Sequence, residues 1–176
     1  SVSDSDVPIV GWMGTRSNLA YFEVIAEALR NLSSHVDFEL RLIVSDLEPL
    51  ESIDLTGVRI RHVEWRGETE VDDLRKIDIG IMPLFSDREW DRYKCPTKMT
   101  QYMAAGIPGV ASPVGFTADV VEHGVSGFLP ASTAEWEQIL ERLIRDPELR
   151  KTIGQAGRKV VSQKYCVEAN HSILAD

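Results

Sequence analysis

The fold class can be predicted from residues 7–32, VPIVGWMGTRSNLAYFEVIAEALRNL. It begins with a nearly continuous apolar run at 7–13, which is typical of a strand buried on both faces of a parallel sheet. A polar turn follows at 14–18, and the residues after it place apolar side chains at helical spacing. This order of strand, turn and helix predicts the first unit of an α/β fold.

The same order of elements recurs along the chain. We expect further strands at 38–44, 58–65, 77–84, 109–112 and 127–129, and helices at 72–76, 97–105, 119–122, 134–145 and 148–165. The acidic, proline-containing segment 46–57 predicts a surface loop. Buried strands that alternate with helices predict a Rossmann-like, doubly wound and mostly parallel sheet of about six strands, with helices on both faces and further C-terminal helices.

Size and composition narrow the class of protein. The chain has 176 residues, which fits a single domain over 1–176 that buries a core without disulfides. Its 19 basic and 28 acidic residues give a formal net charge of −9, so nucleic-acid binding through phosphate neutralisation is not expected. Cys95 and Cys166 form no CxxC pair and the histidines lack metal-ligand spacing, which predicts a reducing compartment and no metal site. The acidic start at 1–6 is unlike a signal peptide and no apolar run reaches the roughly 18 residues of a membrane span, which predicts a cytoplasmic protein without a transmembrane segment.

The loops that follow the strands are the places to look for a ligand. In an open parallel sheet the carboxyl ends of the strands and the helix N-termini meet at one edge. Gly14, Thr15 and Arg16 follow the first strand. Glycine allows the backbone to approach a phosphate, although a plain capped turn uses the same residues. Trp65 ends the third strand, where an aromatic ring can meet a nucleobase.

The segment DREWDRYKCPTK, residues 87–98, gathers basic side chains directly before a helix in an otherwise acidic protein. Pro96 and Thr97 mark the helix start. Lys98 then stands in the first turn, where a cation opposes the helix macrodipole unless an anion is bound. Helical spacing puts Lys98 and Gln101 on one face, toward the crevice, and leaves apolar side chains for the core. The pattern favours an anion site over the alternative, a solvated loop whose acidic side chains neutralise the basic ones.

These residues also resemble a known family. The run KCPTKMTQYMAAGIPGVASPVGFTADVVEHGVSGFLP, residues 94–130, is similar to the C-terminal domain of group 1 (retaining) glycosyltransferases, the nucleotide-sugar half of the two-domain GT-B fold. GWMGTRSNLAYFE at 11–23 and LIRDPELRKTIGQAGRKVV at 143–161 resemble other parts of that domain. The resemblance implies that this chain binds the diphosphate-sugar donor. An amino-terminal domain, absent here, would bind the acceptor, whether glycan, lipid-linked or small molecule.

The resemblance has further implications for activity. It implies a hexosyltransferase-like enzyme that retains the anomeric configuration, requires no cofactor or metal, and is inactive as an isolated domain. Membrane association would come through the absent domain. Two alternatives stay open: a GT-B sugar-nucleotide epimerase, and a nucleotide-binding module without turnover. The transferase interpretation requires roughly 150 to 200 further residues upstream.

Roles for individual residues follow from the same resemblance. Lys94 and Lys98 are the predicted catalytic residues, which would stabilise the charge that grows on the leaving diphosphate. The predicted substrate-binding residues are Gly14, Thr15, Arg16, Trp65, Arg66, Thr97, Gln101, Gly115, Phe116 and Thr117. The family pattern has a pair of glutamates where this chain has Tyr93 and Gln101, so neither position supplies a carboxylate.

Overall fold

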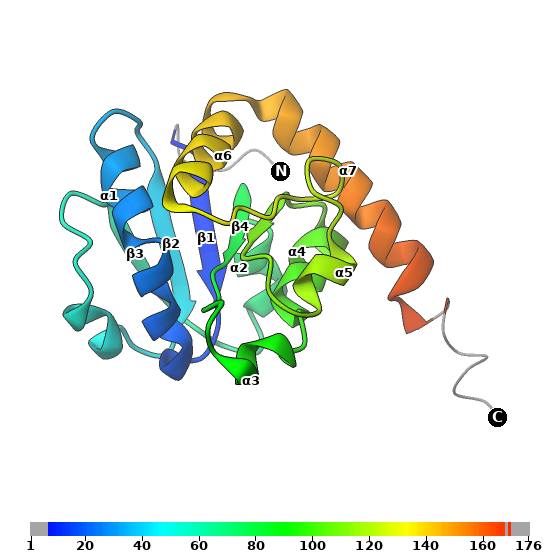
Figure 1. The fold of residues 1–176 in the computed structure, drawn as a ribbon, viewed down its shortest axis with the longest axis horizontal. Helices are drawn as coiled ribbons and strands as arrows, with labels where there is room; N and C mark the ends of the chain where they lie inside the picture. The colour runs from blue at the N-terminus through cyan, green and yellow to red at the C-terminus, as the bar shows by residue number, and fades with distance from the viewer. Residues whose placement is uncertain (1–6, 168, 170–176) are drawn as a thin grey trace.

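The computed structural model describes residues 7–167 and residue 169, so the acidic start at 1–6 lies outside the described residues. The chain forms a parallel sheet in the order β3-β2-β1-β4-β5, with helices on both faces (Figure 1). The strands are β1 (Ile9–Met13), β2 (Glu39–Val44), β3 (Ile60–Glu64), β4 (Ile79–Met82) and β5 (Gly109–Ala111). This doubly wound α/β topology confirms the predicted Rossmann-like fold class.

Within the described residues the sheet has five strands, whereas the sequence predicts about six. The segment expected as the sixth, 127–129, makes a single parallel bridge to β5. The Phe128 amide donates to the Gly109 carbonyl, and the Phe128 carbonyl accepts from the Ala111 amide. The next amide that would continue this ladder belongs to Pro130, which has no N–H to donate. The pairing therefore stops after one residue.

Seven α-helices and two 3-10 helices connect the strands in the described part of the chain. The α-helices are α1 (Ala26–Ser33), α2 (Glu70–Leu74), α3 (Glu89–Arg92), α4 (Thr97–Ala105), α5 (Thr117–Val120), α6 (Thr133–Arg145) and α7 (Pro147–Lys164). The 3-10 helices are η1 (Arg16–Val24) and η2 (Glu48–Ser52), and η2 lies within the predicted surface loop. The bounds of α4 are those that the sequence predicts.

The chain after β1 winds more tightly than its sequence indicates. One α-helix is expected there, but η1 precedes α1. Leu19, Phe22 and Ile25 recur at every third residue and are all fully buried. This spacing matches the three residues per turn of a 3-10 helix. Burial of these side chains against the sheet explains why the tighter helix forms.

Two apolar layers cover the sheet. Helices α1 and α6 pack on one face, and α2, α4, α5 and part of α7 pack on the other. Met99, Tyr102 and Met103 of α4 are fully buried in the second layer, as helical spacing predicts. In Figure 1 the arrow of β1 points toward α3, so this is the carboxyl edge of the sheet. The order of the strands reverses between β1 and β4, which places a topological switch point at that edge.

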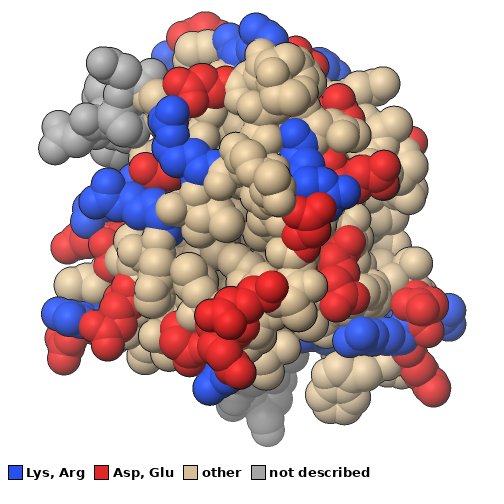
Figure 2. Space-filling model, turned by 90° about the vertical axis from the view of Figure 1, so that its left-hand side faces the viewer, with Lys and Arg blue, Asp and Glu red and all other residues tan. Residues whose placement is uncertain are grey.

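The side of the molecule that carries the edge strand β3 has a mixed surface charge. Figure 2 shows basic side chains interrupted by acidic ones across this face. Charged side chains on an exposed edge strand oppose pairing with another chain. Among the described helices, none is both long and apolar enough to cross a membrane.

Candidate functional site

A pocket of about 420 Å³ opens at the carboxyl edge of the sheet, beside the switch point. The loops after β1, β2 and β3 contribute to its wall, together with the start of α2 and the first turns of α4. These segments are far apart in the sequence and are brought together because parallel strands all end at one edge. The pocket therefore lies where the fold class predicts a ligand.

Seven of the predicted site residues line this pocket: Gly14, Thr15, Arg16, Trp65, Thr97, Lys98 and Gln101. Five others are not part of its lining: Lys94, Arg66, Gly115, Phe116 and Thr117. The lining also includes Asn18, Ser45 and Glu70, none of which the sequence singles out as a ligand-binding residue.

Lys98 brings a largely buried ammonium group to the pocket. Its Nζ lies 5.3 Å from the centre of the Trp12 ring, and no acceptor or carboxylate in the described part of the chain pairs with it. Burial, together with the nearby charge of Lys94, lowers the pKa of Lys98 to about 8. A desolvated cation without a counter-ion is unfavourable on its own, and a bound anion would compensate for it.

The N-terminus of α4 adds to this positive end of the pocket. Pro96 occupies the N-cap position and Thr97 the first helical position, and no side chain caps the helix. The first amides of α4 therefore lack a side-chain acceptor, and the helix dipole favours an anion beside them. Pro96 and Thr97 thus mark the start of this helix, as the sequence predicts.

Gly14 packs directly against the lysine. A Cβ at this position would lie 2.7 Å from atoms of the Trp12 ring and 2.8 Å from Cε of Lys98. The Gly14 amide donates to the Ile43 carbonyl at 3.1 Å. The missing side chain thus makes room for the Lys98 stem, and the amide itself holds the loop to β2.

Lys94 is held by the protein's own acceptors. Its Nζ donates to Oδ1 of Asn18 at 3.1 Å and to the Tyr21 hydroxyl at 2.9 Å. The Tyr21 hydroxyl in turn donates to the buried carboxylate of Asp91. Burial lowers the pKa of Lys94 and raises the pKa of Tyr21 to about 12. Because Asn18 lines the pocket, this network fixes one of its walls from behind.

The predicted arginines are both engaged by carboxylates. Arg16 lines the pocket, but its guanidinium pairs with Glu48 and lies 3.5 Å from Asp46. Arg66 pairs with Glu64 at 2.8 Å and is not part of the lining. Exposed pairs of this kind contribute little to stability, and they partly neutralise the cations.

The turn Gly115, Phe116 and Thr117 lies apart from the pocket. Gly115 has φ +53°, and a Cβ there would collide with the Arg92 carbonyl. Thr117 is fully buried, whereas Phe116 is half exposed. The glycine therefore allows α3 to pack closely against this turn. No cluster of three or more metal-ligating side chains occurs in the described part of the chain.

Glu70 is one of the pocket residues that the sequence does not single out. Its Oε1 accepts a hydrogen bond from Nε2 of Gln101 at 3.2 Å, and its Oε2 accepts one from Nε1 of Trp65 at 3.1 Å. The carboxylate thus joins α2, α4 and the loop after β3. In the sequence it looks like an ordinary acid in the first turn of a helix. Its position shortly after the third strand is the one feature of the sequence that could have indicated a place in the pocket.

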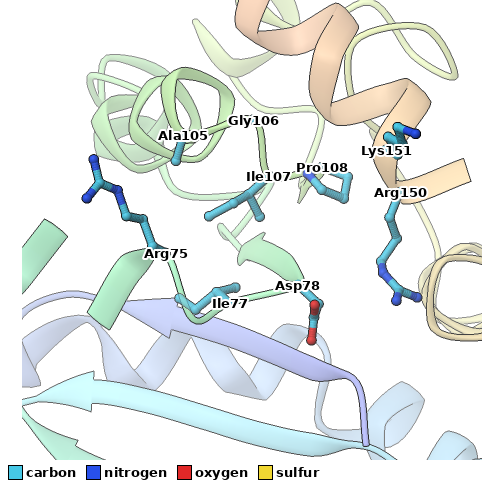
Figure 3. Close-up of a pocket in the computed structure, with 9 residues that line it drawn as sticks. All are labelled: Arg75, Ile77, Asp78, Ala105, Gly106, Ile107, Pro108, Arg150 and Lys151. Atoms are coloured by element: carbon cyan, nitrogen blue, oxygen red, sulfur yellow. The ribbon is translucent and has the colours of Figure 1, made fainter. Parts of the chain in front are cut away.

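A second pocket, of about 270 Å³, lies at the amino edge of the sheet (Figure 3). Asp78 there accepts a hydrogen bond from the Ile9 amide at 2.8 Å. Arg150 donates to two carbonyls at the end of α6, at 2.7 and 3.0 Å. Figure 3 shows Arg75 and Arg150 at opposite ends of this pocket. Asp78 and Arg150 thus serve the protein's own backbone.

Comparison with known proteins adds sequence relatives. The family model for group 1 glycosyl transferases matches residues 7–146. The N-acetyl-alpha-D-glucosaminyl L-malate synthase of Bacillus anthracis is 25% identical over 149 residues, which are 80% of this chain and 37% of that protein. The alpha-1,3/1,6-mannosyltransferase of Homo sapiens is 35% identical over 63 residues, which are 35% of this chain and 15% of that protein. The chain therefore spans well under half the length of these curated relatives.

Solved structures share the fold. The C-terminal domain of a group 1 glycosyl transferase from Francisella tularensis superposes with a TM-score of 0.69 at 21% identity, covering 93% of this chain and 90% of that one. The Anabaena protein HepE, solved in complex with UDP-glucose, gives 0.73 at 20% identity, covering 97% of this chain and 48% of that one. At these identities the likeness shows the fold alone. Since the family model covers most of the sequence, from residue 7 to residue 146, the chain belongs to the group 1 glycosyl transferases.

Proposed function

We propose that this chain, as a single unit over 1–176, binds the nucleoside-diphosphate sugar donor of a retaining glycosyltransferase. The observation that carries the proposal is the ammonium of Lys98, which has no ionic partner among the described residues, beside the N-terminus of α4, which none of their side chains caps. Both features favour an anion, and both lie in a pocket at the switch point of a doubly wound sheet. HepE has a related fold and was solved in complex with UDP-glucose, which supports a nucleoside-diphosphate sugar as the donor.

The pocket suggests how the donor would lie. The diphosphate would sit against Lys98 and the first amides of α4, where the positive charge is concentrated. The ribose would follow along the same face of α4, toward Gln101. The nucleobase would then reach the half-exposed ring of Trp65, whose indole N–H is held by Glu70. Stacking of a base on an aromatic ring tolerates several bases.

The chemical contribution of this chain would be electrostatic. When the bond between the sugar and the diphosphate breaks, negative charge grows on the leaving group. An ammonium and helix amides that are already in place stabilise this charge without reorganisation. Lys98 would make the direct contact. Lys94 would act from behind, by holding Asn18 and by adding positive charge.

The remainder of the reaction would depend on the rest of the longer protein. A second, amino-terminal domain would hold the acceptor, which is a glycan, a lipid-linked sugar or a small molecule, and would bring any association with a membrane. The chain would be cytoplasmic, because the nucleotides from which its donor is made are found in the cytoplasm. Half of an active site loses the orientation of the two substrates, so the chain alone should bind donor without multiple turnovers.

A calorimetric titration tests this function. The chain is titrated with UDP, GDP, ADP and dTDP and with one sugar derivative of each. We expect one nucleotide to bind clearly better than the others, and Lys98→Ala to weaken that binding. Lys151→Ala is the matched control, because this lysine is exposed at the opposite edge of the sheet. If no nucleotide of the panel binds, or if both lysine variants behave alike, the donor site is not here.

A further inference from the structure

We infer that Glu70 supplies the carboxylate that binds the ribose hydroxyls of the donor, with Gln101 as its partner. The inference rests on the proposed function, since it assigns the ribose end of the same pocket. It names a specificity-determining residue from α2, whereas the sequence directs attention to α4.

The pocket holds two opposite charges that do not pair with each other. Lys98 has no carboxylate partner in the described part of the chain. Glu70 accepts hydrogen bonds from the amide of Gln101 and the indole of Trp65, and no cation of the described residues lies within ion-pair distance of it. Both side chains line the same 420 Å³ space. This arrangement fits a ligand that is anionic at one end and carries hydrogen-bond donors at the other.

The spacing along α4 places the ribose beside Glu70. Gln101 follows Lys98 by three residues, so their Cβ atoms are neighbours, about 5–6 Å apart on one helix face. In a nucleoside diphosphate the ribose is the group next to the phosphates. With the diphosphate at Lys98, the ribose therefore lies at Gln101 and the carboxylate that Gln101 contacts.

The hydrogen bonds already made leave acceptors facing the ribose. An ionised carboxylate has about four lone-pair sites, and the contacts from Gln101 and Trp65 use two of them. The amide of Gln101 gives its N–H to Glu70, so its carbonyl oxygen remains available as a further acceptor. Two adjacent ribose hydroxyls are donors and match such a set. The negative charge also repels phosphate, which keeps the diphosphate at the Lys98 end.

The test separates ribose recognition from phosphate recognition. UDP, GDP, their 2′-deoxy and 3′-deoxy analogues, and inorganic diphosphate are titrated into the wild-type chain and into Glu70→Gln. We expect the wild type to prefer the ribonucleotide over a deoxy analogue by about fivefold or more, as for a hydrogen bond to a charged group. Glu70→Gln should abolish most of this preference, whereas the affinity for inorganic diphosphate should stay the same or rise slightly, because a charge that repels phosphate is removed. Glu68→Gln, an exposed acid two residues away, is the matched control and should change neither.

A relocated carboxylate provides a second, independent readout. Gln101→Glu alone places two carboxylates in contact and should weaken nucleotide binding. The double variant Glu70→Gln with Gln101→Glu restores one carboxylate and one amide and should recover the ribose preference. Thermal unfolding of each variant shows whether it is folded. If a single variant is misfolded, the ribose preference of the double variant tests the assignment of Glu70.

The outcomes distinguish the two claims. If Glu70→Gln keeps the full preference for ribose, or if the folded double variant does not recover it, the assignment of Glu70 is wrong, while Lys98-dependent binding would still support the donor site. If the wild type binds neither nucleotide nor diphosphate, the proposed function fails and this inference fails with it.

Discussion

The pockets at the two edges of the sheet both contain acidic and basic side chains, but these side chains have different partners. At the amino edge, Asp78 and Arg150 are bound to backbone groups of β1 and α6. At the carboxyl edge, Lys98 and Glu70 lack an ionic partner in the described part of the chain. Charge that satisfies the protein's own backbone stabilises the fold. Charge that is left unpaired in a pocket costs stability and is kept for a ligand.

The largest expected effect concerns the packing of the amino edge. A Cβ at Gly154 in α7 would collide with the carbonyl of Gly106, at the end of α4. Alanine usually stabilises a helix relative to glycine by about 1 kcal/mol, but overpacking costs about 1–3 kcal/mol and sometimes more. Because this clash is with backbone and not with a flexible side chain, the overpacking cost should exceed the upper end of that range, at about 3–4 kcal/mol. After the helix gain of about 1 kcal/mol, Gly154→Ala should lower the free energy of unfolding by about 2–3 kcal/mol in urea denaturation.

The exposed neighbour Gln155 offers the control for this prediction. Gln155→Ala should change the free energy of unfolding by less than about 0.5 kcal/mol. A Gly154→Ala variant that matches the wild type in stability would show that α7 and α4 do not pack as closely as described.

A substitution at the carboxyl edge should weaken nucleotide binding without lowering the free energy of unfolding. Lys98→Ala should weaken binding of the preferred nucleoside diphosphate by about 1.5–3 kcal/mol, the range for hydrogen bonds to charged groups. Its free energy of unfolding at pH 7 should stay the same or rise, because a buried cation that opposes the α4 dipole is removed. Calorimetry and urea denaturation measure the two quantities. A clear loss of stability with unchanged affinity would make Lys98 a structural residue.

Arg150 sharpens the same contrast from the amino edge. Its guanidinium donates to the Leu143 and Ile144 carbonyls, which end α6. Arg150→Ala should lower the free energy of unfolding by about 1–2 kcal/mol, since charged hydrogen bonds to helix carbonyls are lost. Nucleotide affinity should remain at the wild-type value in calorimetry. Weaker binding in this variant would mean that the two edges are not independent.

The pH dependence of the carboxyl edge should be smaller and has a defined sign. The pKa of Lys98 is about 8 in the folded chain, below the ordinary 10.5. At pH values between about 8 and 10.5 the unfolded chain binds more protons at this lysine than the folded chain does. The contribution of Lys98 to the free energy of unfolding therefore rises with pH in this range. Binding changes in the opposite direction, because deprotonation removes the charge that the diphosphate meets. Affinity should fall by about tenfold or less from pH 7 to pH 9.5.

Lys98→Arg provides the comparison for this titration, because a guanidinium stays charged throughout that range. The other charged groups that line the pocket are Arg16 and Glu70, and Lys94, Asp46 and Glu48 lie beside it. If the arginine variant binds and shows the same decline with pH, a group other than Lys98 titrates.

The smallest effect is expected at Arg16. Its side chain is 52% exposed, and its partners Asp46 and Glu48 are 42% and 69% exposed. Exposed ion pairs contribute about 0–1 kcal/mol, so Arg16→Ala should barely change the free energy of unfolding in urea denaturation. A change above about 1 kcal/mol would indicate that the loop after β1 is held by this network.

Features that depend on neighbouring residues could be predicted from the sequence. The apolar runs and helical periods predicted the α/β class, and Thr97–Ala105 begins and ends where the pattern indicates. The same period assigned Met99, Tyr102 and Met103 to the core and Lys98 and Gln101 to the crevice. These features follow from side-chain direction along one helix, which residue spacing fixes.

The contacts between polar groups that are far apart in the sequence depend on the fold. Glu70 contacts Gln101 across 31 positions of sequence, and Lys94 contacts Asn18 across 76 positions. No local pattern reports such contacts, because they depend on how the strands line up the loops at one edge. The missing sixth strand and the 3-10 winding of η1 have the same origin, since the position of Pro130 beside β5 and burial against the sheet override local preference. Spacing along the chain fixes the direction of a side chain, but its partner is fixed by the fold.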